Sequence, residues 1–203
     1  MISSLVAAGA AAVETDFKRL LAYSTVSQIG YIFLGFSMAN EAGVSGSLLF
    51  ILMHGLAKAG LFLCAGIVIH ATHKRDIREM GGLIKTMPFT GVAFLLCSFS
   101  VIGIPPFGGF FSKFLVIMGT VKAGQVGLAA VALFTALLTM FYLMKVFSLV
   151  FLGEAKSPAP EKTRSMVFVV SLLAFLSLAA GILVSYPTKI VQAATTHILG
   201  MLK

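Results

Sequence analysis

Three basic side chains stand inside long apolar runs of the sequence, where a charge is expensive. His54 and Lys58 lie in the run 44–70, and Lys113 lies in the run 87–120. A helix places His54 and Lys58 on the same face, one turn apart. Loss of hydration disfavours the charged form of a lysine, and an imidazole titrates near neutral pH. The three side chains therefore predict a proton relay at membrane depth.

Each of these residues also has a structural interpretation. His54 and Lys58 could be held by backbone carbonyls or by a partner subunit, which would only lock helix packing. Lys113 could be the counter-ion of an anion or of a carboxylate from another chain. Lys145 lies close to the end of its apolar run. Its long stem lets the ammonium reach the interface, so we expect no relay role for it.

The run that carries Lys113 is interrupted near its middle. It is longer than the about 20 residues that a straight spanning helix needs. Pro105 and Pro106 cannot donate backbone hydrogen bonds, and Gly108 and Gly109 leave helical dihedrals at little cost. We therefore expect two half-helices joined by unwound backbone near mid-membrane, as in ion-coupled transporters. Lys113 would lie in the first turn of the second half-helix, whose positive dipole end further disfavours its charge.

The composition is typical of polytopic membrane proteins. The chain has 203 residues, of which 59% are hydrophobic and 11% charged, and its mean hydropathy is +1.03. The formal net charge of +8 is explained by loop residues, so no nucleic-acid partner is expected. Cys64 and Cys97 are isolated in apolar runs and predict neither a disulfide nor a metal site. We expect no cofactor and no redox centre in this chain, because it has no Gly-rich phosphate loop, Ser/His/Asp set or Cys cluster.

The pattern predicts an all-α, polytopic transmembrane helical bundle with one discontinuous helix, in about five full spans plus one partial span. Residues 1–203 are expected to form a single transmembrane domain. The stretch 1–13 is too short to span and has the character of a helix whose beginning is missing. The expected spans are 20–39, 44–70, 87–120 broken at 105–109, 125–152 and 165–186. The tail, 188–203, is expected to lie along the interface as an amphipathic helix.

Basic residues are distributed unequally between the two expected sides of the membrane. The loops at 14–19, 71–85 and 153–164 hold nine Lys and Arg residues, and the opposite side holds three. The positive-inside rule therefore predicts that these loops face the cytoplasm, or the matrix or stroma of an organelle. The nine are Lys18, Arg19, Lys74, Arg75, Arg78, Lys85, Lys156, Lys162 and Arg164. The three are Lys122, Lys189 and Lys203.

The first complete span carries a cluster of polar side chains. Its members are Ser24, Thr25, Ser27, Gln28 and Tyr31. Small hydroxyls in membrane helices usually form hydrogen bonds between helices. They can also hold water between titratable groups, and the sequence leaves both interpretations open.

With these motifs in order, the sequence resembles the antiporter-like subunits of respiratory complex I, of Mrp-type cation/proton antiporters and of membrane-bound hydrogenases. The resemblance rests on DFKRLLAYSTVSQIGY at 16–31, HGLAKA at 54–59, GGL at 81–83 and PPFGGFFSK at 105–113. Among subunits N, M and L of NADH-quinone oxidoreductase, the last motif most resembles subunit N, and among Mrp antiporter proteins it most resembles the MrpD-like members.

In that family, central lysines pass protons between two half-channels built from inverted repeats. The resemblance implies that Lys58 links the half-channels, with His54 beside it, and that Lys113 belongs to the second broken helix. Residues implied to support the relay are Lys18, Ser24, Ser27, Gln28, Tyr31, Pro105, Pro106, Gly108 and Gly109. The chain resembles only the C-terminal half of a complete subunit. The first broken helix, its lysine and the family's glutamate have no counterpart here, so another chain or segment would supply the N-terminal half-channel.

The resemblance implies proton translocation within a larger redox-driven complex of the NADH-quinone oxidoreductase or hydrogenase type. The chain would be a subunit of an ion-translocating oxidoreductase in a bacterial or archaeal cell membrane or an organellar inner membrane. Its partners would be other membrane subunits and the lipid bilayer. An Mrp-type sodium/proton antiporter module is an alternative, although a deep carboxylate would favour sodium and no expected span contains one. A structural membrane scaffold without transport is the alternative from another class.

Overall fold

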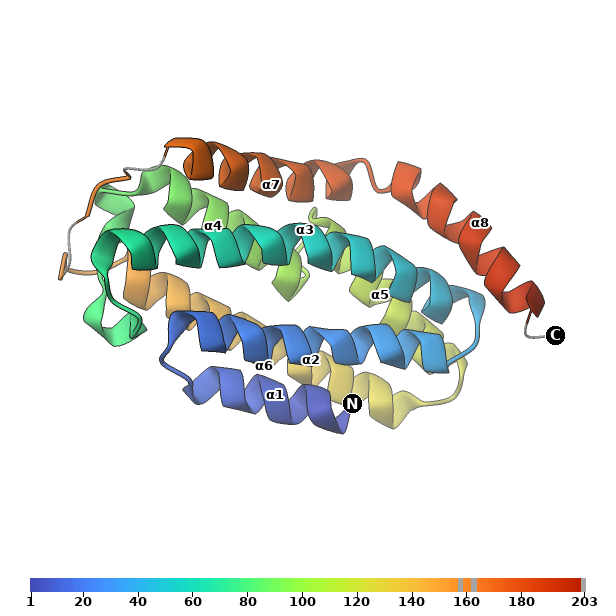
Figure 1. Ribbon diagram of the computed structural model, residues 1–203. Helices are drawn as coiled ribbons and strands as arrows, with labels where there is room; N and C mark the ends of the chain where they lie inside the picture. Colours follow the sequence, from blue (N-terminus) through green and yellow to red (C-terminus); the bar gives the residue numbers. More distant parts are fainter. Residues whose placement is uncertain (157–158, 162–163, 202–203) are drawn as a thin grey trace.

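The computed structural model describes residues 1–156, 159–161 and 164–201, and this part of the chain is all-α, as predicted (Figure 1). The main helices are α1 (Ile2–Val13), α2 (Phe17–Ser37), α3 (Glu41–Thr72), α4 (Pro88–Ile102), α5 (Gly108–Lys122), α6 (Val126–Phe151), α7 (Arg164–Ile182) and α8 (Ser185–Met201). Two short 3-10 turns, Ile77–Glu79 and Leu83–Lys85, connect α3 to α4. The helices run back and forth along a common axis, and only α8 bends away from it (Figure 1).

Local signals in the sequence set several helix starts. The Asp16 side chain accepts a hydrogen bond from the backbone N–H of Arg19 at 2.9 Å, which caps α2. Asn40 caps α3 in the same way through the N–H of Gly43, also at 2.9 Å. Pro88 occupies the first turn of α4, where its missing N–H costs nothing.

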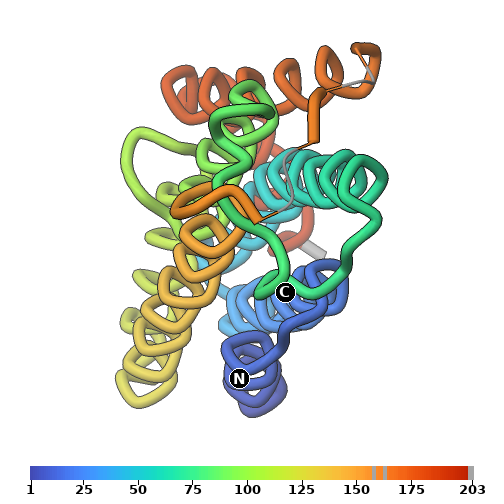
Figure 2. The backbone as a smooth tube through the Cα atoms, turned by 90° about the vertical axis from the view of Figure 1, so that its left-hand side faces the viewer, coloured from blue at the N-terminus to red at the C-terminus, as the bar shows by residue number. Residues whose placement is uncertain are grey.

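Helix α3 is the centre of the bundle. It packs against α2, α4, α5, α7 and α8, and the view along the bundle shows it between α7 above and α2 below, with one side left open (Figure 2). Small residues permit the close approach. A Cβ on Gly46 would meet the backbone of α5 at Val116, 2.6 Å from its nitrogen, and a Cβ on Gly60 would meet Cys97 Sγ of α4 at 2.5 Å. The helix with His54 and Lys58 is therefore the one with the most protein around it.

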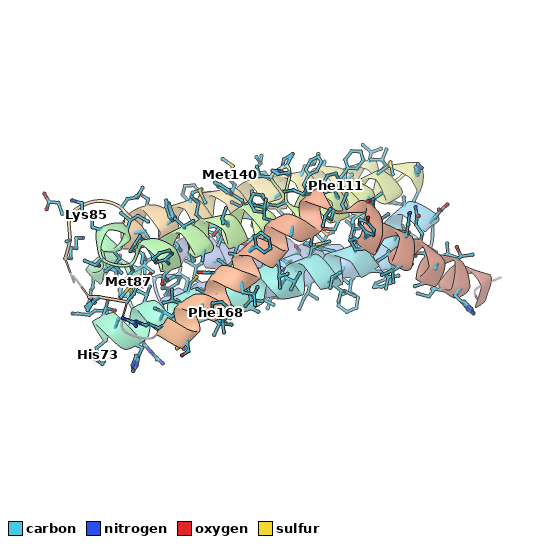
Figure 3. All side chains as sticks on the ribbon, turned by 90° about the horizontal axis from the view of Figure 1, so that it is seen from above. His73, Lys85, Met87, Phe111, Met140 and Phe168 are labelled. Carbon is cyan, nitrogen blue, oxygen red and sulfur yellow. The ribbon has the colours of Figure 1, made fainter. Side chains whose placement is uncertain are left out.

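Four of the described helices are long and apolar enough to cross a membrane: α2, α3, α6 and α7. Large apolar side chains on the outer faces of α6 and α7 point away from the bundle, among them Met140, which is 48% exposed, and Phe168, which is 69% exposed (Figure 3). Water would disfavour such a surface, whereas acyl chains solvate it. Helices α4 and α5 follow each other end to end and together run the length of the bundle (Figure 1).

The three basic loops lie at the same end of the bundle, which we call the loop end (Figure 1). Backbone hydrogen bonds join them: Phe17 N–H to the Arg75 carbonyl at 3.0 Å, and Gly82 N–H to the Leu152 carbonyl at 2.9 Å. His73 and Lys85 mark this end in Figure 3. Of the expected basic residues, Lys162 and Lys203 lie outside the described part of the chain. That the loop end faces the cytoplasm stays a prediction.

The broken helix differs in detail from the expectation. Helix α4 ends at Ile102 and α5 begins at Gly108, so the unwound segment is 103–107 rather than 105–109. The reason is Gly103, which adopts a φ of 90° and ends α4 before the prolines are reached. Once the prolines have been passed, Gly108 and Gly109 can join the next helix.

The other expected boundaries differ by a few residues from those observed, because capping side chains lie outside the apolar runs. The span expected at 20–39 is α2, the span at 44–70 is α3, the span at 125–152 is α6 and the span at 165–186 is α7. The tail forms α8, whose Val191 and Thr195 are buried.

Candidate functional site

Lys58 is buried at the contact of α3 with α2. It is 5% exposed, and its ammonium donates hydrogen bonds to the Ser24 Oγ at 2.7 Å and the Leu21 carbonyl at 3.1 Å. Both acceptors are neutral, so the charged form of Lys58 has no buried counter-ion among the described residues. A lysine held in this way can lose its proton without breaking an ion pair.

The Ser24 hydroxyl, which accepts the hydrogen bond from Lys58, belongs to a larger group of hydrogen-bonded polar side chains on α2 and α6. Ser24 Oγ also accepts a hydrogen bond from the Tyr142 hydroxyl of α6, at 2.8 Å. One turn further along α2, the Gln28 amide nitrogen donates to Thr139 Oγ1 at 3.0 Å, while Gln28 Oε1 is buried without a protein partner in the described structure. Buried polar atoms of this kind are where water is expected. Hydroxyl groups both donate and accept hydrogen bonds, so this group of polar side chains has the chemistry that proton transfer needs.

Lys113 is buried at the helix break and is 4% exposed. Its ammonium donates to the Val101 carbonyl at 2.8 Å and the Ile102 carbonyl at 3.2 Å. These are the last carbonyls of α4, which have no partner within their own helix and form the negative end of its dipole. The ammonium also lies 4.8 Å from the centroid of the Tyr31 ring, within the range of a cation–π contact.

This geometry corrects the expected position of Lys113. It lies in the second turn of α5, not the first, and its ammonium points back across the break towards α4. Side chains on a helix lean towards its N-terminus, which directs a long lysine stem at the break. The charge therefore meets the carbonyl end of α4 rather than the amide end of α5.

His54 lies in the same region as both lysines. It is 8% exposed, and neither Nδ1 nor Nε2 has a hydrogen-bond partner in the described structure. Its ring centroid is 5.6 Å from that of Phe50, and the Lys113 ammonium is 5.8 Å from the Phe50 centroid. One turn along α3 comes Lys58. A neutral imidazole has one donor and one acceptor nitrogen, and in His54 both are open to a further partner such as water.

The break itself is closed by tight backbone packing. A Cβ on Gly109 would collide with the Ser100 carbonyl oxygen of α4, and a Cβ on Gly108 would meet Met53 Sδ of α3. On the other side, a Cβ on Gly181 of α7 would collide with the Pro106 carbonyl oxygen. These contacts bring α3, α4 and α7 close to the break, while Pro105 and Pro106 themselves remain exposed on the surface of the described chain.

The structure separates the supporting residues into two groups. Ser24, Gln28 and Tyr31 belong to the polar surroundings of the lysines, and the Tyr31 hydroxyl donates to the Ala132 carbonyl of α6. Ser27 faces α1 instead, where Ser4 Oγ donates to its backbone carbonyl at 2.6 Å. The Ser4–Ser27 contact is an example of bonding between helices, whereas Ser24 contacts Lys58 and Tyr142, and a relay role for Ser24 stays a prediction.

Two other lysines, Lys18 and Lys145, lie away from the buried polar side chains around Lys58 and Lys113. Lys18 is exposed in the first turn of α2, at the loop end. The Lys145 ammonium donates to the Ala12 carbonyl at 2.9 Å and ties α6 to the end of α1. The structure does not bring either of them to His54, Lys58 or Lys113.

Sequence reasoning missed Thr139 and Tyr142 on α6, and Gly103 and Gly181 beside the break. A signal for the first pair exists: Thr135, Thr139 and Tyr142 recur at helical spacing in an otherwise apolar run. Single glycines in apolar helices carry no comparable signal.

No group of three or more His, Cys, Asp or Glu side chains within 1–156, 159–161 and 164–201 is arranged to hold a metal ion. The chain has seven Asp and Glu residues. All of them lie at helix ends or in loops: Glu14, Asp16, Glu41, Asp76, Glu79, Glu154 and Glu161.

Known proteins of one membrane-protein family are similar to most of this chain. Residues 1–139 match the family model described as NADH:quinone oxidoreductase/Mrp antiporter, transmembrane. The D component of the Na(+)/H(+) antiporter of Alkalihalophilus pseudofirmus is 41% identical over 143 residues, which are 70% of this chain and 29% of that protein. The NADH-quinone oxidoreductase subunit N of Desulforudis audaxviator is 39% identical over 154 residues, 76% of this chain and 31% of that protein. The chain thus spans less than a third of the length of these relatives.

The fold has a close counterpart among solved structures. A chain of the Mrp complex from Dietzia sp. DQ12-45-1b superposes with a TM-score of 0.93 at 26% identity, covering 97% of this chain and 45% of that one. The broken helix and the central position of α3 are therefore set in an architecture shared with a multisubunit membrane complex.

Proposed function

Because the chain belongs to the NADH:quinone oxidoreductase/Mrp antiporter transmembrane family, we propose that it is the C-terminal half-channel of an antiporter-like subunit and conducts protons across an energy-transducing membrane. The half-channel would comprise residues 1–203 as one transmembrane domain. His54, Lys58 and Lys113 would exchange protons, with water completing the path between them.

The observation that carries this proposal is the bonding of the two buried ammonium groups. Lys58 is held by a hydroxyl and a carbonyl, and Lys113 by two carbonyls and an aromatic face. A structural counter-ion would need a buried carboxylate, and the acidic residues of this chain lie at helix ends or in loops. Lysines without a fixed negative partner can alternate between charged and neutral forms as their surroundings change.

The proposal includes partners. Other membrane subunits of a multisubunit complex would cover the exposed apolar faces together with lipid, and another chain or segment would supply the N-terminal half-channel. Redox chemistry would come from elsewhere in the complex and would bias the buried lysines through space or through α3. In this arrangement the chain alone would not pump.

An Mrp-type sodium/proton antiporter is the second candidate. It is favoured by the 41% identity to a protein named as a Na(+)/H(+) antiporter component and by the fold of an Mrp complex. Against sodium binding by this chain itself, hard cations prefer carboxylate and carbonyl oxygens, and the interiors of the described spans offer no carboxylate. A sodium site would then belong to a partner subunit.

The test compares two substitutions of Lys113 in the assembled complex. Lys113→Met removes the titratable group, and Lys113→Arg keeps a charge that cannot be released at physiological pH. Both should abolish proton flux while native gels show normal assembly. Full flux in Lys113→Arg, with assembly lost in Lys113→Met, would identify Lys113 as a structural counter-ion and overturn the proposal.

A further inference from the structure

A pocket of about 220 Å³ lies at the end of the bundle opposite the loop end, between α3, α5 and α8. Its lining combines both charge signs with apolar groups. The lining residues are Glu41, Ala42, Ser45, Leu115, Met118, Lys122, Thr188 and Gln192. It does not include His54, Lys58 or Lys113, so it is separate from the proposed proton path.

The two charged residues of this pocket have no partner in the described structure. Glu41 is the first residue of α3 and Lys122 is the last residue of α5. Although both line the pocket, their side chains form no ion pair with each other and no hydrogen bond to other described residues. An occupant with one positive and one negative group would satisfy both charges at once.

The hydroxyl groups of the pocket are already engaged. Ser45 Oγ shares a hydrogen bond of 2.9 Å with Thr195 Oγ1 of α8, and Thr188 Oγ1 donates to the Val184 carbonyl at 2.7 Å. Recognition is therefore left to Glu41, Lys122 and the exposed amide of Gln192. Leu115 and Met118 offer an apolar wall directly below.

The position of the pocket selects the kind of occupant. Glu41 and Lys122 stand where two membrane helices end, and lipid headgroups lie at that depth. The wall of Leu115 and Met118 belongs to α5 and runs from there towards the membrane interior. We propose that this pocket binds a zwitterionic phospholipid with a primary ammonium, phosphatidylethanolamine, from the leaflet opposite the loop end.

Each charge would have a defined role in this complex. The Glu41 carboxylate accepts hydrogen bonds from the ethanolamine ammonium, which a choline headgroup cannot donate. Lys122 and Gln192 donate to the phosphate, and Leu115 and Met118 contact the upper part of an acyl chain. The lipid would join α3 to α5 and α8. This inference concerns a separate site and does not depend on the proposed transport function.

The test is lipid titration of the full chain, in detergent, followed by native mass spectrometry. Phosphatidylethanolamine, phosphatidylcholine and phosphatidylglycerol with identical acyl chains are compared. Phosphatidylethanolamine should bind at least about fivefold more tightly than phosphatidylcholine. Glu41→Gln should remove that preference, and Lys122→Met should weaken binding of both lipids. Lys189→Met, an exposed lysine of α8 that does not line the pocket, is the control with the same charge change and should leave all affinities unaltered.

Several results would overturn the proposal. Equal binding of the ethanolamine and choline lipids would exclude recognition by Glu41, and tighter binding of phosphatidylglycerol would indicate a purely anionic ligand. An effect of Lys189→Met equal to that of Lys122→Met would indicate unspecific attraction. Thermal unfolding is recorded for each variant. If Glu41→Gln did not fold, the test would rest on Lys122→Met alone. Unchanged affinity of Lys122→Met for phosphatidylethanolamine and phosphatidylcholine would then contradict the proposed site.

Discussion

The two buried lysines are stabilised by different parts of the protein. Lys58 joins two continuous helices and rests on a side-chain hydroxyl, Ser24, which is itself bonded to Tyr142. Lys113 bridges the two halves of a broken helix and rests on the free carbonyls of Val101 and Ile102. Lys58 has one rotatable acceptor, the Ser24 hydroxyl, beside the Leu21 carbonyl, whereas both hydrogen-bond acceptors of Lys113 are backbone carbonyls.

Because their hydrogen-bond acceptors differ, Lys58 and Lys113 should differ in how they take up and release a proton. A hydroxyl can pass a proton on, because it donates and accepts at the same time. A backbone carbonyl only accepts, so it stabilises the charged form of Lys113 without offering a way out. In the proposed path, the break would stabilise the charged form of Lys113, whereas the contact of α2 with α3 would let Lys58 pass a proton to a hydroxyl.

The largest effect is expected from closing the space at the break. Gly109→Ala would drive a Cβ into the Ser100 carbonyl oxygen, so α4 and α5 must separate and the carbonyls that hold Lys113 must move. Overpacking of this kind costs about 3 kcal/mol, at the upper end of its usual range. Thermal unfolding in detergent should show the loss, and proton flux of the complex should fall with it.

Gly55→Ala is the matched control for this substitution. Gly55 lies in α3, where a Cβ would meet nothing within 4 Å, and alanine is the better helix former. Stability should rise slightly. Equal damage from both substitutions would mean that the tight contact at the break is not what holds the Lys113 site together.

A smaller effect is expected from removing the hydroxyl beneath Lys58. Ser24→Ala leaves the ammonium and the Tyr142 hydroxyl without their shared partner, which costs about 2 kcal/mol for buried groups. Proton flux should fall more than tenfold. Ser27→Ala is the neighbouring control, because it keeps the backbone carbonyl that accepts the 2.6 Å hydrogen bond from Ser4 and removes only the longer contact of 3.5 Å between the two hydroxyls. Similar losses in both variants would contradict the distinction between the two serines.

The smallest effect is expected at the loop end, where charges are exposed. Hydrogen bonds from Arg78 lower the pKa of Asp76 to about 2 from its ordinary value of 3.8. Because the folded pKa is the lower one, the stabilisation is present above about pH 4 and is lost as the pH falls towards 2. For this solvent-accessible pair it is on the order of 0.5 kcal/mol.

Asp76→Asn should therefore unfold at a slightly lower temperature than the wild type at pH 6 and at the same temperature near pH 2. High salt should reduce the difference at pH 6. A difference that persisted at pH 2 would place the effect in packing rather than in charge.

The two lysine sites also show which features could be predicted from the sequence. His54, Lys58 and Lys113 stand out because a basic residue in an apolar run is costly, and the break stands out because prolines and glycines interrupt one. The partners of these residues could not be predicted in the same way. The Tyr142 hydroxyl meets Ser24 from 118 positions away, a contact that depends on how α6 packs against α2.

Helix boundaries show the same limit at a smaller scale. Asp16 and Asn40 start their helices before the apolar runs begin, and Gly103 ends α4 before Pro105. The direction of the Lys113 side chain follows from where α5 begins, so an error of a few residues at the break reversed the expected contact from a helix N-terminus to a helix C-terminus.

The central claim, that two differently held lysines belong to one proton path, is tested most directly by proton flux through the assembled complex. Lys58→Met, Lys113→Met and the double variant are measured beside Lys145→Met, whose ammonium only ties α6 to α1. If the lysines act in series, each single substitution abolishes flux, the double variant is no worse, and Lys145→Met keeps most of the activity. Near-normal flux in either single variant, with assembly intact, would contradict the account.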